Sequence, residues 1–136
     1  PEIFEGIVQI KSVSREAGSR TKMAVKSIDE KIDPIGACVG PKGSRVKNIV
    51  DELGDEKIDI IKYSDDPAEY ISASLSPSKV EKVEVNEEEK SAVVVVPDYQ
   101  ISLAIGKEGQ NARLAAKLTN WKIDIKSESQ AKQDQE

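Results

Sequence analysis

Apolar residues in the first half of the chain alternate along short segments and then recur at helical spacing. Asp33 directly precedes Pro34, and this pair predicts the cap and first turn of a short helix that ends at Gly40. Gly54 is expected to stop the helix that follows. The predicted elements are, in order, a short helix or strand lead-in from residue 3, a strand ending near 13, a turn over 15–20, a strand over 23–28, a helix over 34–39, an amphipathic helix over 44–53 and a strand over 58–63.

The second half repeats this order with one helix added in front. Asp66 and Glu69 have the spacing of a capping arrangement ahead of that helix, and Asp98 is expected to cap a later one. The acidic run Glu87–Glu89 is typical of a solvated hairpin tip. The predicted elements are a helix over 67–75, strands over 80–85 and 92–96, a helix over 99–106, a helix over 110–118 and a strand over 123–126, followed by a disordered tail over 127–136.

A glycine pattern occurs in both halves, between the two paired helices of each. Gly40-Pro41-Lys42-Gly43 and Gly106-Lys107-Glu108-Gly109 lie 66 positions apart, and the apolar residues ahead of them keep the same offset. The strand sequence Lys-Ile-Asp-Ile also occurs twice, beginning at Lys57 and at Lys122. These matches indicate an internal duplication. We therefore predict an α+β fold of two domains, over residues 1–64 and 65–126, each with a three-stranded sheet packed with helices.

Composition narrows the possible chemistry. The 136 residues include no histidine and a single cysteine, Cys38, so an internal disulfide and the usual neutral-pH proton shuttle are both absent. A Walker-type loop needs Ser or Thr after Gly-Lys, whereas Glu108 follows Gly106-Lys107. We predict no enzyme activity, no metal site and no cofactor. No apolar run approaches the roughly 18 residues of a membrane span, so we expect a soluble, cytoplasmic, monomeric fragment without a signal peptide, cut from a longer protein.

Charge is distributed unevenly, although the formal net charge is −5. Residues 10–48 hold nine basic and four acidic side chains, whereas residues 49–98 hold five basic and fourteen acidic ones. Residues 99–136 are nearly balanced, with six basic and five acidic side chains. The basic excess therefore lies beside the first glycine pair, and we expect that copy to attract an anion more strongly than the second.

Two glycines three apart allow a sharp turn and expose backbone N–H groups at the start of a helix, which is a favourable seat for phosphate. Basic and amide side chains beside each turn would add charge and hydrogen bonds. The residues expected to contact a phosphate backbone are Gly40, Pro41, Lys42, Gly43, Ser44, Arg45 and Lys47 in the first copy and Gly106, Lys107, Glu108, Gly109, Gln110, Asn111 and Arg113 in the second.

Aromatic residues make up only 4% of the chain, too few near the glycine turns for base stacking to be the main contact. An aliphatic groove with strand-edge backbone groups is the expected alternative for unpaired bases. The residues predicted to line it are Val39, Val46, Ile58 and Ile60 in the first copy and Ile105, Ala112 and Ile123 in the second.

These motifs carry a family resemblance. Paired helices around Gly-x-x-Gly, each followed by a strand, are similar to KH domains, in which this loop clamps about four nucleotides of RNA backbone. The helix before the hairpin in the second unit matches the prokaryotic, type II arrangement. The stretches 33–40, 66–69 and 103–118 resemble the tandem KH region of the bacterial NusA family of transcription termination and antitermination factors, and the resemblance covers nearly the whole chain.

The resemblance implies a module that binds single-stranded nascent RNA while other domains of the full-length protein contact RNA polymerase and further transcription factors. A second hypothesis remains open. The acidic segment 49–98 would suit a docking surface for a basic partner, such as RNA polymerase or another elongation factor, with the KH folds as scaffold.

Overall fold

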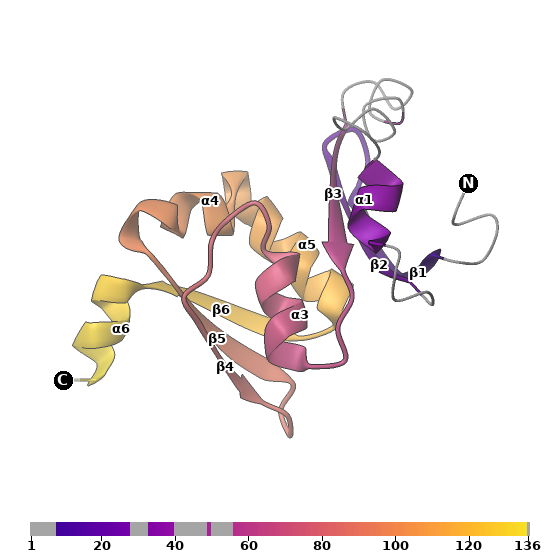
Figure 1. Cartoon of the computed structure of the whole chain (residues 1–136). Coiled ribbons are helices and arrows are strands. Elements are labelled where there is room, and N and C mark those ends of the chain that lie inside the picture. Colours follow the sequence, from indigo (N-terminus) through magenta and orange to yellow (C-terminus); the bar gives the residue numbers. More distant parts are fainter. Residues whose placement is uncertain (1–7, 28–32, 40–48, 50–55, 136) are drawn as a thin grey trace. The chain divides into compact units, whose positions relative to one another are not determined.

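The computed structural model describes residues 8–27, 33–39, 49 and 56–135, and the chain divides into two units, Pro1–Ser64 and Asp65–Glu136 (Figure 1). Each unit contains a three-stranded sheet with helices packed on it. The predicted α+β fold of two units, each with a three-stranded sheet, is confirmed. None of the described helices is both long enough and apolar enough to cross a lipid bilayer.

The first unit is built on a sheet with strand order β1-β2-β3. Strands β1 (Val8–Glu16) and β2 (Arg20–Ser27) are antiparallel, and β3 (Lys57–Lys62) runs parallel to β2. Pairs between Arg15 and Thr21 and between Glu16 and Arg20 extend the hairpin, so the connecting turn is shorter than the predicted 15–20. Three predictions lie outside the described residues: the helix option from residue 3, position 28 of the second strand, and the amphipathic helix over 44–53. Of that last helix only Ile49 is described.

Helix α1 (Pro34–Val39) begins as its sequence predicts. A carboxylate oxygen of Asp33 accepts a hydrogen bond of 3.0 Å from the backbone N–H of Ile35, and Pro34 is the first helical residue. Proline costs nothing at this position because its missing N–H would have had no helical partner.

The second unit follows the same topology with one helix in front. Its elements are α3 (Pro67–Ser74), β4 (Lys82–Asn86), β5 (Ser91–Val96), the 3₁₀ turn η2 (Asp98–Gln100), α4 (Ile101–Ile105), the 3₁₀ turn η3 (Lys107–Gly109), α5 (Gln110–Thr119), β6 (Lys122–Ser127) and α6 (Glu128–Gln135). Strand β5 pairs antiparallel with β4 and parallel with β6. In both units, therefore, an antiparallel pair is followed by a parallel edge strand.

The core of the second unit lies between one face of the sheet and helices α3, α4 and α5 (Figure 1). Alternate residues of β5, Ala92, Val94 and Val96, are buried because successive strand side chains point to opposite faces. They pack against residues of all three helices, Ile71 of α3, Ala104 of α4 and Ala115 of α5. This packing fixes α4 and α5, and with them the loop that joins the two helices.

Asp98 does not cap the following helix, which corrects the prediction made for it. The cap position of η2 is Pro97, which makes no side-chain capping bond. The carboxylate of Asp98 instead accepts hydrogen bonds from the backbone N–H of Ser129, at 3.0 Å, and from the Ser129 hydroxyl. These bonds lower the pKa of Asp98 below its ordinary value. The two donors of Ser129 thus bind the Asp98 carboxylate in place of the backbone N–H groups at the start of the helix.

Helix α6 occupies most of the segment 127–136 that was expected to be a disordered tail. Ser127 Oγ accepts from the backbone N–H of Gln130 at 3.2 Å, and Gln130 Oε1 accepts from the backbone N–H of Ser127 at 3.1 Å. This reciprocal pair is a capping box, which satisfies two backbone donors at the helix start. The structure thus differs from a prediction that rested on low apolar content alone.

Candidate functional site

The second Gly-x-x-Gly loop joins α4 to α5 through residues with positive φ angles. Gly106 has φ 81° and ends α4, with its N–H donating to the Ser102 carbonyl at 2.8 Å. Gly109 has φ 77° and precedes α5, and its N–H donates to the Gly106 carbonyl at 3.1 Å. Glycine adopts such angles without the clash that a Cβ atom brings. The sharp turn predicted between two helices is present.

Gly106 also lies against the first turn of α5. A Cβ atom at this position would be 2.7 Å from the backbone nitrogen of Asn111 and 2.8 Å from its Cβ. The same construction at Gly109 meets only the Arg113 guanidinium, at 3.9 Å. The close approach of two helices therefore requires glycine at Gly106, whereas at Gly109 only the backbone angle favours it.

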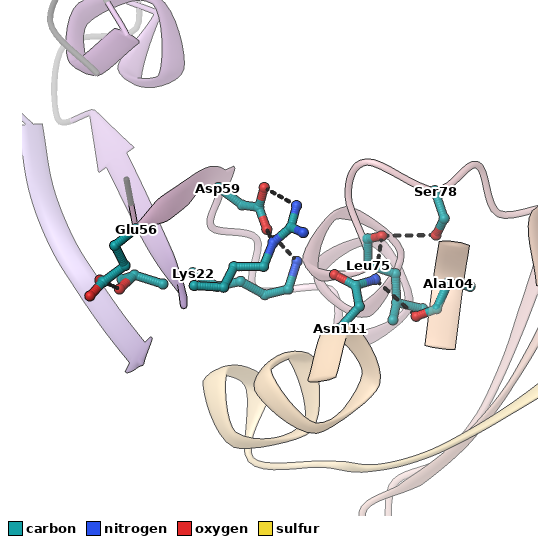
Figure 2. A network of polar contacts seen from close by, with 9 residues as sticks. Lys22, Glu56, Asp59, Leu75, Ser78, Ala104 and Asn111 are labelled. Atoms are coloured by element: carbon teal, nitrogen blue, oxygen red, sulfur yellow. Dashed lines mark hydrogen bonds and ion pairs between the residues drawn. The ribbon is translucent and has the colours of Figure 1, made fainter. Parts of the chain in front are cut away.

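The buried side chain of Asn111 stabilises the loop by hydrogen bonds to neighbouring carbonyls (Figure 2). Its side chain is only 2% exposed, and its Nδ2 donates to the carbonyls of Leu75, at 3.0 Å, and Ala104, at 2.9 Å. The side chain thus ties α5 to the ends of α3 and α4. This placement corrects the expectation that Asn111 offers its amide to a phosphate backbone, because the carbonyls of two neighbouring helices already take both of its N–H groups.

The remaining loop residues lie near the surface. Lys107, Glu108 and Arg113 are exposed, and Gln110 is half-buried. Arg113 Nη1 donates to the Glu108 carbonyl at 3.0 Å, and Glu108 has φ 56° and ψ 26°, a left-handed conformation that is uncommon for a residue other than glycine. The sequence predicted the charge of Arg113 near the loop but not this bond to the backbone.

Backbone donors are available at the start of α5. Within the part of the chain that the structure describes, no hydrogen bond uses the N–H groups of Lys107 and Glu108. No side chain caps α5 at Gly109. The helix macrodipole places partial positive charge at this end. The arrangement suits an anion, because backbone N–H groups and the Lys107 ammonium lie on one short segment.

The predicted groove residues of the second copy are all at least partly exposed. Ile105 is 38% exposed, and Ala112 and Ile123 are half-buried. The sequence prediction did not include Ala116 and Ile125, which are also half-buried. Ala116 lies one helical turn after Ala112, and Ile125 lies two strand positions after Ile123. The helical and strand periodicities that selected the first pair would also have selected the second.

Strand β6 lies at the edge of its sheet, whose order is β4-β5-β6. The backbone N–H of Lys122 donates to Lys90 at 2.9 Å, on the side of β5. Because residues of a parallel strand alternate between its two sides, the backbone groups of Ile123 and Ile125 face away from β5. The outer edge of β6 therefore presents the backbone N–H and carbonyl groups of Ile123 and Ile125.

The first predicted site is described only in part. The glycine pair itself and its neighbours lie outside the described residues, and of the predicted groove Ile58 and Ile60 are half-buried residues of β3. Val39 is the last residue of α1. The predicted residues outside the described ones are Gly40, Pro41, Lys42, Gly43, Ser44, Arg45, Val46 and Lys47.

A carboxylate supports the hairpin of the first unit. Glu56 accepts bonds from the Arg15 guanidinium, at 2.8 to 3.1 Å, from the Gly18 N–H, at 2.8 Å, and from the Thr21 hydroxyl, at 2.5 Å. The bonds from Arg15, Thr21 and Gly18 lower the pKa of Glu56 to about 2. Glu56 is therefore charged at neutral pH and holds the β1–β2 turn to the start of β3.

A second ion network lies on the sheet of the first unit (Figure 2). Asp59 accepts from Arg20 at 2.7 and 2.9 Å and from Lys22 at 2.9 Å. Burial would raise the pKa of Asp59, but the bonds and charges of Arg20 and Lys22 lower it overall. Burial lowers the pKa of Lys22. Among the described residues, no group of three or more histidine, cysteine, aspartate or glutamate side chains has the arrangement of a metal site.

Comparison with known proteins decides the family. The model of the NusA-like first KH domain matches residues 1–63, and that of the NusA-like second KH domain matches residues 67–133. The chain belongs to the NusA-like KH domain family. The region that matches the second KH domain contains the loop between α4 and α5. The family resemblance seen in the sequence is thus confirmed.

The chain is similar to part of several longer proteins. The transcription termination/antitermination protein NusA of Halalkalibacterium halodurans is 67% identical over 98% of this chain and 35% of its own length. The Bacillus subtilis protein of the same name is 64% identical, with 98% and 36% covered, and that of Mycobacterium tuberculosis H37Rv is 56% identical, with 95% and 38% covered. The chain therefore spans about a third of the length of these relatives.

One solved structure shows the same arrangement of elements. The crystal structure of APE1850 superimposes with a TM-score of 0.61 at 27% sequence identity, and the match covers 92% of this chain and 94% of that chain.

Proposed function

We propose that the chain binds single-stranded RNA through its two Gly-x-x-Gly loops, as part of a bacterial transcription elongation, termination and antitermination factor. The observation that carries this proposal is the second loop. It offers the N–H groups of Lys107 and Glu108, which have no acceptor in the described chain, at the positive end of α5 in a NusA-like KH domain. No catalytic step is part of the proposal.

The loop is suited to the phosphate of an RNA backbone. Two adjacent N–H groups can donate to phosphate oxygens, and the exposed Lys107 ammonium adds a charge beside them. Glu108 carries the opposite charge, which weakens the attraction at this loop. The first loop has Pro41-Lys42 at the corresponding positions. Proline has no backbone N–H, so this loop offers only the donor of Lys42 there. Because it has no carboxylate and lies in the basic segment 10–48, we still expect it to bind phosphate more strongly.

Unpaired bases are the expected ligands of the apolar surface beside the loop. Ile105, Ala112 and Ile123 provide aliphatic contact, and the outward backbone groups of Ile123 can bond base edges. In a duplex the Watson–Crick edges of the bases are paired and their faces are stacked, so these groups are not accessible to such a surface. Single-stranded RNA is therefore preferred in this proposal.

The relatives suggest the setting in which the RNA is bound. Several similar proteins are named transcription termination/antitermination proteins. We infer that the chain acts on the nascent transcript and that the full-length protein contacts RNA polymerase and other transcription factors. The share of the relatives that the chain spans fits an RNA-binding part of a larger factor.

The test compares RNA affinity between loop variants and a charge-matched control. Replacing Lys107 and Glu108 by Asp changes the net charge of the second loop by −2. Replacing Pro41 and Lys42 by Asp gives the corresponding first-loop variant, with a charge change of −3. Lys117→Asp makes the same charge change as the second-loop variant, on an exposed residue farther along α5. We expect each loop variant to bind an unstructured oligoribonucleotide about tenfold more weakly or worse, with a smaller effect for Lys117→Asp. Equal affinities for all variants, with folding preserved, would contradict the proposal.

A specific surface favours a second candidate function, the docking of a basic protein partner such as RNA polymerase. Glu87, Glu88 and Glu89 are all exposed at the β4–β5 hairpin tip, and Asn86 Oδ1 accepts from the Glu89 N–H at 3.3 Å, which orders the turn. Replacing the three glutamates by lysine should weaken polymerase binding and leave RNA affinity intact if this surface docks a protein. The two candidate functions are thus separated by which variant affects which partner.

A further inference from the structure

We propose that Arg113 is a positioning residue of the second loop: it holds the Glu108–Gly109 peptide group in place, so that the neighbouring N–H groups stay directed outward for a phosphate. This inference rests on the proposed RNA binding and deepens it. It also changes the expected role of Arg113, whose charge and exposure predict a direct phosphate ligand.

The Glu108–Gly109 peptide group is held at both of its polar ends. Its carbonyl, that of Glu108, accepts from Arg113 Nη1 at 3.0 Å, and its N–H, that of Gly109, donates to the Gly106 carbonyl at 3.1 Å. Rotation of this peptide plane would break both bonds at once. The pair of bonds therefore favours one conformation of the loop over its flipped alternative.

The conformation that is held in this way is one that Glu108 would not adopt readily by itself. Its φ of 56° and ψ of 26° are left-handed, and its Cβ atom crowds the backbone in that region. Gly109 next to it, with φ 77°, shares the left-handed conformation without this cost. A glutamate between two glycines needs support from outside the turn, and the Arg113 bond to its carbonyl supplies it.

Arg113 is well anchored for this role. It lies on α5, where its neighbours Leu114 and Ala115 are fully buried and the Asn111 side chain binds the carbonyls of Leu75 and Ala104. The guanidinium therefore extends from a fixed helix back to the loop that precedes it, five residues away. The acceptor of this bond is a carbonyl oxygen of the chain itself, so the bond forms whether or not RNA is bound.

The two roles predict different salt dependences. A side chain that neutralises a phosphate contributes about 0.7 to the slope of log affinity against log salt for single strands. A side chain that only positions the loop changes affinity at every salt concentration by the same factor. Lys107, one residue from Glu108, is the reference for a phosphate contact in the same loop.

The experiment uses the whole chain with Pro41 and Lys42 replaced by Asp, so that binding at the second loop dominates. Binding of an unstructured oligouridylate is followed by NMR at the Gly106 and Gly109 amides over a series of KCl concentrations. Arg113→Ala, Arg113→Lys and Lys107→Ala are compared in this background. The exchange rate of the Gly109 amide with solvent is measured for each variant without RNA.

We expect Arg113→Ala to weaken binding several-fold with an unchanged salt slope, and to speed exchange of the Gly109 amide. Arg113→Lys, which keeps a donor of similar reach, should restore most of both properties. Lys107→Ala should lower the slope by about 0.7 and leave Gly109 exchange unchanged. A slope lowered equally by Arg113→Ala, or an unchanged Gly109 amide in that variant, would overturn the positioning role. Absence of any RNA-induced shift in the background chain would instead refute RNA binding by this loop, and the exchange measurement would still decide the role of Arg113.

Discussion

Gly106 and Gly109 both have positive φ angles, yet their backbone regions and their surroundings differ. Gly109 is in the left-handed helical region, whereas Gly106, with ψ 171°, is in a region that residues other than glycine hardly enter. A methyl group at Gly106 would lie 2.7 Å from the Asn111 nitrogen, whereas at Gly109 the nearest atom is 3.9 Å away. Alanine at Gly109 therefore carries only the cost of its φ angle, about 1–2 kcal/mol. Alanine at Gly106 adds steric overlap with the first turn of α5, and we expect a total loss of about 3 kcal/mol in the free energy of unfolding.

Urea unfolding of the second unit measures this difference. Trp121 is the single tryptophan of the chain and packs against the core of that unit, so its fluorescence reports on the transition. Gly109→Ala is the control, because it introduces the same methyl group at a similar φ of 77°, although its ψ is 12° and that of Gly106 is 171°. Equal destabilisation by the two substitutions would show that the close approach at Gly106 does not limit the fold.

Glu56 gives the first unit a pH dependence at acidic pH. Its pKa falls from the ordinary value of 4.5 to about 2 because Arg15, Thr21 and Gly18 donate to the charged form. A carboxylate whose pKa is lower in the folded state stabilises that state above pH 4.5 and loses this contribution as the pH falls toward 2. We expect Glu56→Gln to be less stable than the wild type at neutral pH, with a difference that shrinks below pH 4.5.

NMR of the first unit checks this expectation. The Gly18 amide donates to Glu56 Oε1 at 2.8 Å, so its chemical shift should titrate with the carboxylate near pH 2 and not near 4.5. Thermal unfolding of wild type and Glu56→Gln at several pH values supplies the stability difference. A difference that is independent of pH across this window would mean that the hydrogen bonds do not depend on the charge.

Local sequence patterns located the loop but not the direction of its side chains. The repeated glycines and the flanking helical spacing placed the turn between α4 and α5 correctly. The side chains of Asn111 and Arg113 are polar and follow the loop, so a local argument assigned both to a ligand. Their acceptors are the carbonyls of Leu75, Ala104 and Glu108. For Asn111 the decisive partner Leu75 lies 36 residues away, and no pattern within one helix contains that information.

Secondary structure was predictable wherever one periodicity dominated, as in β5 and α5. The alternation of Ala92, Val94 and Val96 and the helical spacing of Leu114 and Leu118 both correspond to buried faces. The end of the chain differed because α6 has almost no apolar face: among residues 128–133, Ala131 alone is partly buried and the others are exposed. Capping and one hydrogen-bonded link to Asp98 hold this helix, so hydrophobic periodicity was uninformative there.

Helix α6 should therefore depend on its cap. Ser127→Ala removes the oxygen that accepts from the Gln130 N–H at 3.2 Å, and we expect the local stability of α6 to fall by about 1 kcal/mol. Hydrogen exchange of the α6 amides should become about fivefold faster, and exchange of the buried β5 amides should not change. Gln133→Ala, on an exposed position of the same helix, is the control. If both variants exchange at equal rates, the capping box does not stabilise α6.

The charge of the whole chain opposes its proposed ligand, because the formal net charge is −5. Fourteen acidic side chains lie in residues 49–98, whereas residues 10–48 carry a net +5. RNA binding must therefore come from local contacts rather than from the overall field. If about five phosphates are neutralised, log affinity should fall with log salt at a slope of roughly −3.5. Filter binding of single-stranded RNA at several KCl concentrations measures this slope, and a slope near zero would contradict phosphate contacts.

The two domains should bind one RNA together, because only residues 63–66 lie between the end of β3 and the start of α3. A linker of this length keeps the second loop at a high effective concentration once the first is bound. On an RNA of about four nucleotides, which fills one loop, the wild type should bind no more tightly than the better of its two single-loop variants. On an RNA of about twenty nucleotides, the wild type should exceed either variant by on the order of 100-fold. The variants carry Asp at residues 41 and 42 or at residues 107 and 108, and fluorescence anisotropy measures each affinity. An advantage of the wild type that does not grow with RNA length would mean that the two loops bind independently.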